Sequence, residues 1–161
     1  MQYKKNLIGH LILELEQAYQ AALTEAKRAY STSTDKANVA ENKYDTLALE
    51  AAYLAEGQAK RAAQCLADLK AIRTLEARDY SPGDAIAVGA LIILEDEHEK
   101  SLSLFLAPVA GGLKFVVEER AIMVITPSSP LGRHLLGKFV DDEFEFTVGS
   151  RKKNYLISDI V

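Results

Sequence analysis

Residues 38–56 read N-V-A-E-N-K-Y-D-T-L-A-L-E-A-A-Y-L-A-E, a stretch typical of the start of a long helix. Asn38 suits the N-cap position, because its side-chain oxygen accepts a hydrogen bond from a backbone N–H that has no helical partner. Glu41, three residues later, is placed to reach back to the N–H of the cap, as in a capping box. We therefore predict that a helix begins here and that its first turn carries acids to the end of a long hairpin.

Two heptad-like rows of apolar side chains flank this start, separated by the turn-favouring residues 31–36. Each row has small residues near the turn and large ones at its far end, so the rows match only if two helices pair antiparallel. Arms of roughly 30 residues give a rod of about 45 Å, which we expect to protrude. The rows are Ile8, Ile12, Leu15, Tyr19, Ala22, Ala26 and Ala29, and Leu47, Ala51, Ala55, Ala59, Ala62, Leu66 and Leu69.

The pattern changes near Arg78, where Ser81-Pro82-Gly83-Asp84 is a turn signal and the residues beyond it become β-branched and alternating. We therefore predict a coiled-coil hairpin domain in residues 1–77 and a second domain in residues 78–161.

The second domain has the pattern of an antiparallel sheet with one short helix, which makes the fold class α+β. Ser128 or Ser129 suits the N-cap of that helix, Pro130 its first position and Gly137 its end. Its buried stripe is predicted to be Leu131, Leu135 and Leu136. The predicted strands are 85–94, 101–106, 113–117, 122–126, 143–148 and 154–160.

Composition sets limits on function. The chain has 161 residues, 48% of them apolar, and a net charge of −4, so it has no overall basic field for nucleic acid. One cysteine, Cys65, excludes an intrachain disulfide. His10 and Glu14 interrupt the apolar stretch near the N-terminus, so we expect no signal peptide or membrane span and a cytoplasmic location.

No constellation of an enzyme active site is visible in the sequence. His10, His98 and His134 fall in three different predicted elements, and Cys65 lies in the middle of a helix near its apolar row. Gly111-Gly112 lacks the Lys-Ser/Thr of a phosphate loop. We therefore do not expect an autonomous enzyme.

The acids at the predicted hairpin tip are Asp35, Glu41 and Asp45. Carboxylate oxygens suit Mg²⁺, which takes one or two of them and keeps several waters. Acids in a first helical turn also complement the helix dipole, and capping explains Glu41 without a metal. Spacing alone leaves both roles open and favours the capping role.

The segment Thr126–Lys138, T-P-S-S-P-L-G-R-H-L-L-G-K, followed by Asp142 and Glu143, resembles the C-terminal signature of the bacterial transcript cleavage factors GreA and GreB. Glu41-Asn42 and Glu56-Gly57 resemble matching parts of the Gre coiled coil. The resemblance implies an FKBP-like C-terminal domain that docks at the rim of the RNA polymerase secondary channel while the hairpin enters the channel. RNA 3' ends and DNA would be reached through the polymerase by a monomeric factor.

The resemblance also implies site residues. The Gre tip places an Asp and, three residues later, a Glu beside a Mg²⁺ that is shared with the polymerase and not tightly bound to the factor. Glu41 matches that Glu, but Asn38 stands at the Asp position, and Asp35 is the candidate substitute. The matching docking residues are Ser129, Pro130 and Leu131, for which helix initiation and packing are the alternative role.

A further departure is Asp141-Asp142 where the family has Gly-Asp, which predicts a differently shaped turn. Alternative functions are a channel-binding regulator without cleavage activity, an FKBP-like peptidyl-prolyl isomerase, and an adaptor whose coiled coil binds another helical partner.

Overall fold

The computed structural model describes residues 2–34, 46–81 and 83–161 of the chain. It divides into two compact units, Ile12–Lys70 and Met1–Leu11 with Ala71–Val161. The beginning of the first helix thus belongs to the same unit as the sheet. The division of the chain into domains 1–77 and 78–161 stays a prediction.

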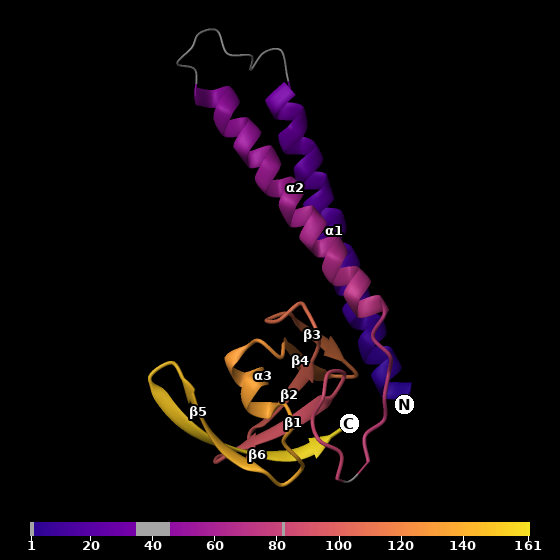
Figure 1. The fold of residues 1–161 in the computed structure, drawn as a ribbon, viewed down its shortest axis with the longest axis vertical. Coiled ribbons are helices and arrows are strands. Elements are labelled where there is room, and N and C mark those ends of the chain that lie inside the picture. Colours follow the sequence, from indigo (N-terminus) through magenta and orange to yellow (C-terminus); the bar gives the residue numbers. More distant parts are fainter. Residues whose placement is uncertain (1, 35–45, 82) are drawn as a thin grey trace. The chain divides into compact units, whose positions relative to one another are not determined.

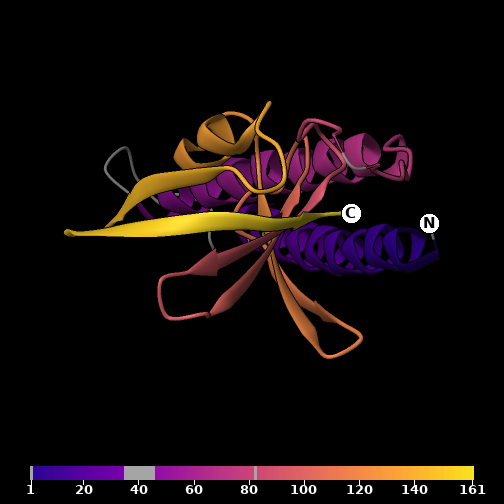
Figure 2. The same cartoon turned by 90° about the horizontal axis from the view of Figure 1, so that it is seen from below.

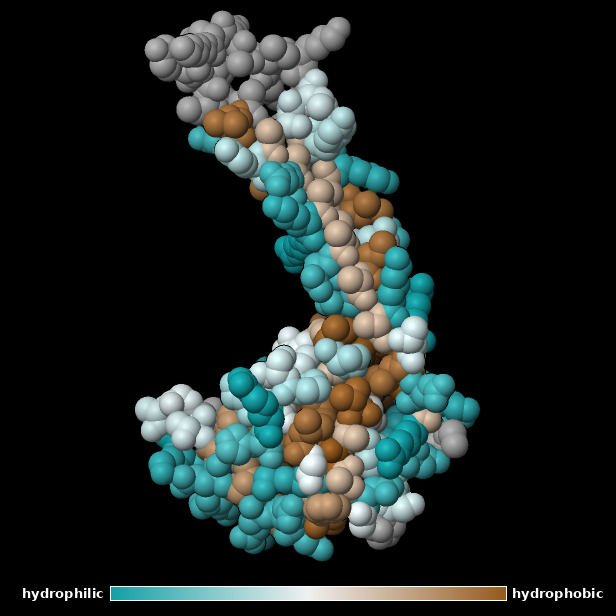
Figure 3. Space-filling view, in the orientation of Figure 1, coloured by the Kyte–Doolittle hydropathy of each residue, from teal (hydrophilic) through white to brown (hydrophobic). Residues whose placement is uncertain are grey.

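The unit Ile12–Lys70 is a helical hairpin made from parts of α1 (Gln2–Thr34) and α2 (Thr46–Arg73), which run side by side in opposite directions (Figure 1). Much of the two predicted apolar rows faces inward, because Leu15, Ala22, Ala29, Ala62 and Leu69 are buried, although Ala59 of the second row is exposed. Small apolar residues follow the hairpin as a pale-brown column between teal polar residues (Figure 3). None of the helices in the described ranges is long and apolar enough to cross a membrane.

α1 continues through most of the segment that was predicted to be the turn. The hydroxyls of Thr32 and Thr34 donate to the carbonyls of Arg28 and Tyr30, four residues earlier, at 3.0 Å each. These bonds satisfy the short polar side chains inside the helix, so they do not compete with the helical backbone. The predicted cap Asn38 lies outside the described residues.

The other unit contains a six-stranded sheet, in the spatial order β3-β4-β2-β1-β6-β5 (Figure 1). The strands are β1 Leu91–Asp96, β2 Ser101–Leu106, β3 Lys114–Val117, β4 Arg120–Ile125, β5 Glu143–Val148 and β6 Arg151–Ile160.

The prediction of an antiparallel sheet holds at every pairing except β2·β4, which is parallel. The chain leaves β2, passes outward to the edge strand β3 and returns as β4 between them, so β2 and β4 have the same direction. β1 also begins later than the predicted 85–94 strand. Ile86 there bonds instead with the segment after α3, through Lys138 O at 2.8 Å and Gly137 N at 2.9 Å.

α3 (Pro130–Leu135) lies against one face of the sheet (Figures 1 and 2). Leu135 is fully buried in the core formed with Ile92, Leu94 and Leu104, and Leu131 packs against that core. The prediction that Leu136 is buried is wrong, because this residue is the C-cap and is 46% exposed. Gly137 follows with φ +83°, a left-handed conformation that ends the helix and favours glycine.

Candidate functional site

The predicted tip acids Asp35 and Glu41 and the departure at Asn38 all lie outside the described residues. The structure therefore neither supports nor contradicts a Mg²⁺ site at the tip. Within the described ranges, no group of three or more His, Cys, Asp and Glu side chains is placed to hold a metal ion.

The described part of the hairpin nearest the tip carries exposed ion pairs. Glu25 and Arg28 are 3.6 Å apart, and Glu56 and Lys60 are 2.7 Å apart. The hydrogen bond from Lys60 lowers the pKa of Glu56 below its ordinary value. Such hydrated pairs stabilise a helix little, and their mixed charges give no continuous basic stripe.

The predicted docking residues do come together, at the start of α3. Ser129, one of the two predicted candidates, is the N-cap: its Oγ accepts from the backbone N of Gly132 at 3.0 Å and donates to Thr126 O at 2.8 Å. Pro130 follows at the first helical position and is exposed, whereas Ser129 and Leu131 are half-buried. The segment therefore has a helix-capping role and also leaves atoms free for contact.

Gly132 lets α3 approach the end of β4 very closely. A Cβ atom at this position would lie 1.9 Å from the carbonyl oxygen of Thr126. Any larger residue would push α3 away from the sheet, so this glycine fixes where the predicted docking residues lie.

A cavity of about 370 Å³ opens beside these residues. Its lining combines Ser129, Pro130 and Leu131 with apolar side chains from other elements, notably Met123 of β4 and Phe146 of β5. Sequence reasoning did not assign these two residues to the site. Their alternating positions in predicted strands were the available signal, but only the pairing of the strands shows that both lie on the α3 face.

His134 of α3 joins an aromatic cluster rather than a catalytic site. Its ring lies 5.4 Å from Phe146 in an edge-to-face arrangement and 6.2 Å from Phe144, nearly parallel. Phe144 in turn stacks on Tyr155 at 5.7 Å. The cluster holds β5 against α3 and supports one wall of the cavity.

The Asp141-Asp142 turn is shaped by a left-handed residue. Asp141 has φ +70°, the region that glycine adopts most easily. Asp142 closes the turn, because its Oδ2 accepts from Phe139 N at 2.9 Å and its carbonyl accepts from Ile157 N at 3.0 Å. Asp141 thus takes a conformation that glycine adopts easily, at the position where the Gre signature has glycine. The expectation of a differently shaped turn stays a prediction.

The root of α1 is tied to the segment before β1 through Lys4, which is 1% exposed. Its ammonium group donates to Arg78 O and lies 4.4 Å from the centroid of the Tyr80 ring. Burial lowers the pKa of Lys4 to about 8, although the nearby Asp79 raises it. Arg78 lies over the same ring at 4.9 Å, so this is a structural anchor built from cations and one aromatic side chain.

The remaining candidates for catalysis are dispersed. His10 Nδ1 lies 2.8 Å from Asn6 O on the same helix, and the backbone N of His98 donates to Asp96 in a turn. Cys65 is half-buried on α2. The described residues thus bring together no nucleophile, base and acid from this set.

Comparison with known proteins gives matches to one group of factors. No family model matches the chain. Transcription elongation factor GreA of Sphingopyxis alaskensis is 38% identical over 78 residues, which cover 48% of this chain and 46% of that protein. GreA of Neorickettsia sennetsu is 26% identical over 145 residues, covering 89% of this chain and 85% of that protein.

Among solved structures, one described as the structure of the transcription factor Gfh1 is 21% identical and covers 92% of each chain, with a TM-score of 0.42. The chain spans about half the length of the three GreA relatives that are 36–38% identical to it, 46% for each. The chain is thus similar in sequence to GreA transcription elongation factors, with 36–38% identity over about half of its length.

Proposed function

We propose that the protein is a Gre-like elongation factor that binds RNA polymerase as a monomer in the cytoplasm and modulates elongation. Its sheet domain docks at the rim of the secondary channel through Ser129, Pro130 and Leu131, and its hairpin tip enters the channel. The sequence similarity to GreA carries the proposal. The capped, partly exposed start of α3, within the segment that resembles the Gre signature, supports it.

The chemistry belongs to the polymerase in this proposal, and the factor is not an enzyme by itself. Glu41, with Asp35 as its partner, supplies carboxylate oxygens near a Mg²⁺ that the polymerase holds, and carboxylates are ligands that Mg²⁺ prefers. Asn38 cannot supply the negative charge of an aspartate at the matching position. Transcript cleavage is therefore expected to be slower than with an Asp-Glu pair.

The test is cleavage of RNA in backtracked polymerase complexes. The wild-type protein should shorten the RNA 3' end, Glu41→Ala and Asp35→Ala should abolish shortening, and Asn38→Asp should accelerate it. Glu50→Ala, which removes an exposed acid from the described part of α2, is the matched control and should leave the rate unchanged.

A second version of the function is favoured by Asn38 alone: a channel-binding regulator without cleavage activity. Polymerase binding without RNA shortening by the wild-type protein would support this version. Failure of the protein to bind polymerase in a pull-down would contradict both versions.

A proline-peptide isomerisation assay should show no turnover above background. The reason is that the residues lining the cavity beside α3 include one aromatic residue, Phe146, rather than several.

A further inference from the structure

One long side of α1 in the hairpin is apolar and partly open to solvent. Leu23 and Tyr30 each come directly after a buried alanine of the inward-facing row. A helix turns by about 100° per residue, so both side chains lie on the same side of that row. Leu23 is half-buried and Tyr30 is 65% exposed. The hairpin alone therefore leaves these large side chains incompletely covered.

α2 has a matching apolar side. Ala63 comes directly after the buried Ala62, and the exposed Ala52 and Ala59 recur at helical spacing on the same side. Because α1 and α2 run in opposite directions, an equal rotation from their buried rows brings both sets to one side of the hairpin. Figure 3 shows apolar residues following the hairpin as a column with polar residues along both borders. We call this surface the hairpin face, and its residues are Leu23, Tyr30, Ala52, Ala59, Ala63 and Leu66.

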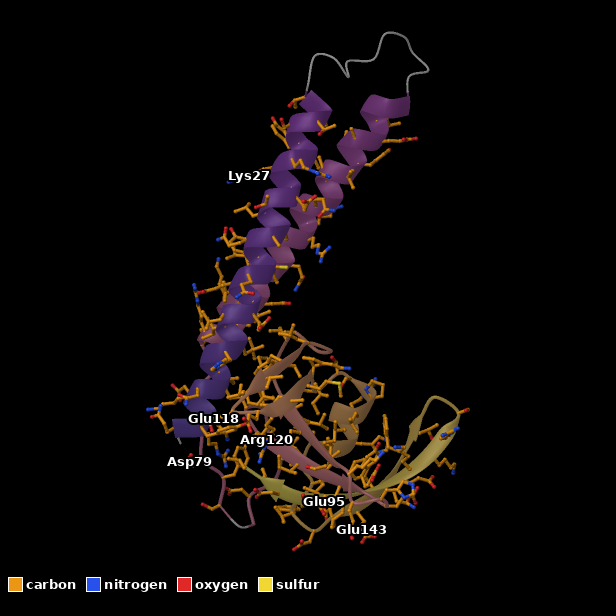
Figure 4. The ribbon with its side chains drawn as sticks, turned by 180° about the vertical axis from the view of Figure 1, so that it is seen from behind. Lys27, Asp79, Glu95, Glu118, Arg120 and Glu143 are labelled. Atoms are coloured by element: carbon orange, nitrogen blue, oxygen red, sulfur yellow. The ribbon has the colours of Figure 1, made fainter. Side chains whose placement is uncertain are left out.

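Charged residues border the hairpin face on both helices. Each comes directly after a residue of the predicted apolar rows, and these residues are Glu16 and Lys27 on α1 and Glu56 and Lys70 on α2. Figure 4 shows Lys27 projecting from the side of α1 away from α2. Each border of the face thus has an acid towards one end and a base towards the other.

The two charge pairs are centred at the same level of the hairpin. The midpoint between Glu16 and Lys27 lies between residues 21 and 22, and the midpoint between Glu56 and Lys70 is residue 63. A groove between the helices is lined by Ala29 of α1 and by Leu54 and Gln58 of α2, which places residue 29 level with about residue 56. Seven residues back along α1 and seven forward along α2 place residues 22 and 63 at one level.

This arrangement of charges is complementary to itself. A two-fold axis across the hairpin at that level lays a second copy on the face in the reverse direction, so that every neighbouring pair of helices is antiparallel. Glu16 of one copy then meets Lys27 of the other, Glu56 meets Lys70, and each contact occurs twice. Leu23 and Ala63 lie within two residues of the axis, where the small alanine side chain permits close approach.

The hairpin face is large enough for a weak specific interface. At 1.5 Å per residue and about 10 Å per helix, residues 52–70 and the facing part of α1 cover roughly 28 Å by 20 Å, or about 1,100 Å² counted on both copies. Specific interfaces bury more than about 1,000 Å², and those below about 1,200 Å² are typically weak. A dissociation constant in the micromolar range is expected.

We propose that two copies of the free protein pair through the hairpin face in this two-fold, antiparallel arrangement. A uniformly acidic or basic partner would meet a like charge on each border, whereas a second copy matches both signs. In the proposed function the hairpin acts singly, so the pair is a form of the protein away from polymerase. The inference does not depend on that function.

Sedimentation equilibrium of the full chain at low salt tests the pairing, because it measures mass independently of shape. The mass should rise with concentration from that of one chain towards that of two. Lys27→Glu sets two glutamates against Glu16 residues in each pair and should raise the Kd about tenfold. Combining it with Glu16→Lys should restore the wild-type Kd. Glu56 already contacts Lys60 of its own helix at 2.7 Å, so Glu16 and Lys27 give the cleaner test.

Arg28→Glu is the matched control. Arg28 comes directly before the buried Ala29, so it turns to the other side of the hairpin, where it lines the groove with Leu54 and Gln58. Its reversal should leave the Kd unchanged within twofold. Leu23→Gln, which alters the face without altering charge, should raise the Kd about tenfold. Thermal melts check that each variant is folded.

Three results would overturn the inference. The first is a mass of one chain at every concentration of the wild-type protein, and the second is growth beyond the mass of two chains, since a two-fold pairing is closed. The third is weakening by Arg28→Glu as strong as that by Lys27→Glu, or no recovery in the Glu16→Lys, Lys27→Glu double variant. Each result would leave the proposed function intact, because none of the measurements involves polymerase.

Discussion

Ser129 and Gly132 form one unit at the start of α3: the hydroxyl of Ser129 caps the backbone N of Gly132 at 3.0 Å, and the missing side chain of Gly132 lets the cap sit against Thr126. The resemblance to the Gre signature made Ser129 a candidate for docking. The structure shows that its conformation and that of the exposed Pro130 are set by this pair.

We expect Ser129→Ala to lower the free energy of unfolding by about 1 kcal/mol, because the N–H of Gly132 loses its acceptor. Gly132→Ala should cost more, since the added Cβ would overlap a backbone oxygen. Denaturant unfolding measures both changes. Ser128→Ala is the control; its hydroxyl contacts Thr126 Oγ1 and not a helix N–H, so a loss as large as that of Ser129→Ala would contradict the capping role.

Glycine is expected to stabilise the two-residue turn between β3 and β4. Glu118 and Glu119 have φ of +48° and +65°, a left-handed conformation that costs a residue with a side chain about 1 kcal/mol. Glu119→Gly should therefore raise the melting temperature by a few degrees. Glu97→Gly, an exposed turn position without a positive φ, should not raise it; equal gains in both variants would argue against relief of backbone strain.

Asp141→Gly is the corresponding change at the turn before β5. Because Asp141 has φ +70°, glycine should stabilise the domain by roughly 0.5–1 kcal/mol. Asp142→Gly should destabilise it, since the Asp142 carboxylate accepts from Phe139 N. Paired denaturant titrations of the two variants separate the effects. A loss of stability in Asp141→Gly would show that the aspartate has a role beyond its backbone conformation.

Lys4 gives a pH dependence with a definite sign. Its pKa is lowered from 10.5 to about 8 because burial outweighs Asp79, so the folded protein releases this proton before the unfolded chain does. Unfolding therefore takes up a proton between these two values, and stability rises with pH across that window. The gain from Lys4 should be about 2 kcal/mol between pH 7.5 and pH 10. Burial raises the pKa values of the half-buried Tyr3 and Tyr80, which works in the opposite direction near pH 10.

Lys4→Met removes this titration, so its free energy of unfolding should change less over the same pH range than that of the wild-type protein. Urea unfolding of both proteins at several pH values makes the comparison. Parallel pH profiles would mean that Lys4 keeps an ordinary pKa in the folded state.

The sequence predicted the features that depend on local patterns. The heptad spacing from Leu15 to Ala29 marked the buried row of α1, and alternation gave β2 and β5 with their observed bounds. The cap at Ser129 followed from the proline after it. Each of these signals lies within a few neighbouring residues.

Features that depend on distant segments were missed. The parallel pairing of β2 with β4 depends on where β3 lies, and the late start of β1 depends on bonds from Ile86 to residues after α3. Lys4 lies four residues before Ile8, in line with the apolar row of α1, and this spacing was a sign that Lys4 is buried. The partners of Lys4 come from residues 78–80, which the row does not indicate. The tip acids Asp35 and Glu41 stay predictions.

β5 ends the sheet, so one side of its backbone has no strand beside it among the described residues. An unpaired edge is a template on which a second copy can align and start fibre growth. Two such edges meeting antiparallel would bring Glu143 and Glu145 of one molecule against those of the other. The acids on this strand therefore disfavour pairing of two molecules through their β5 edges.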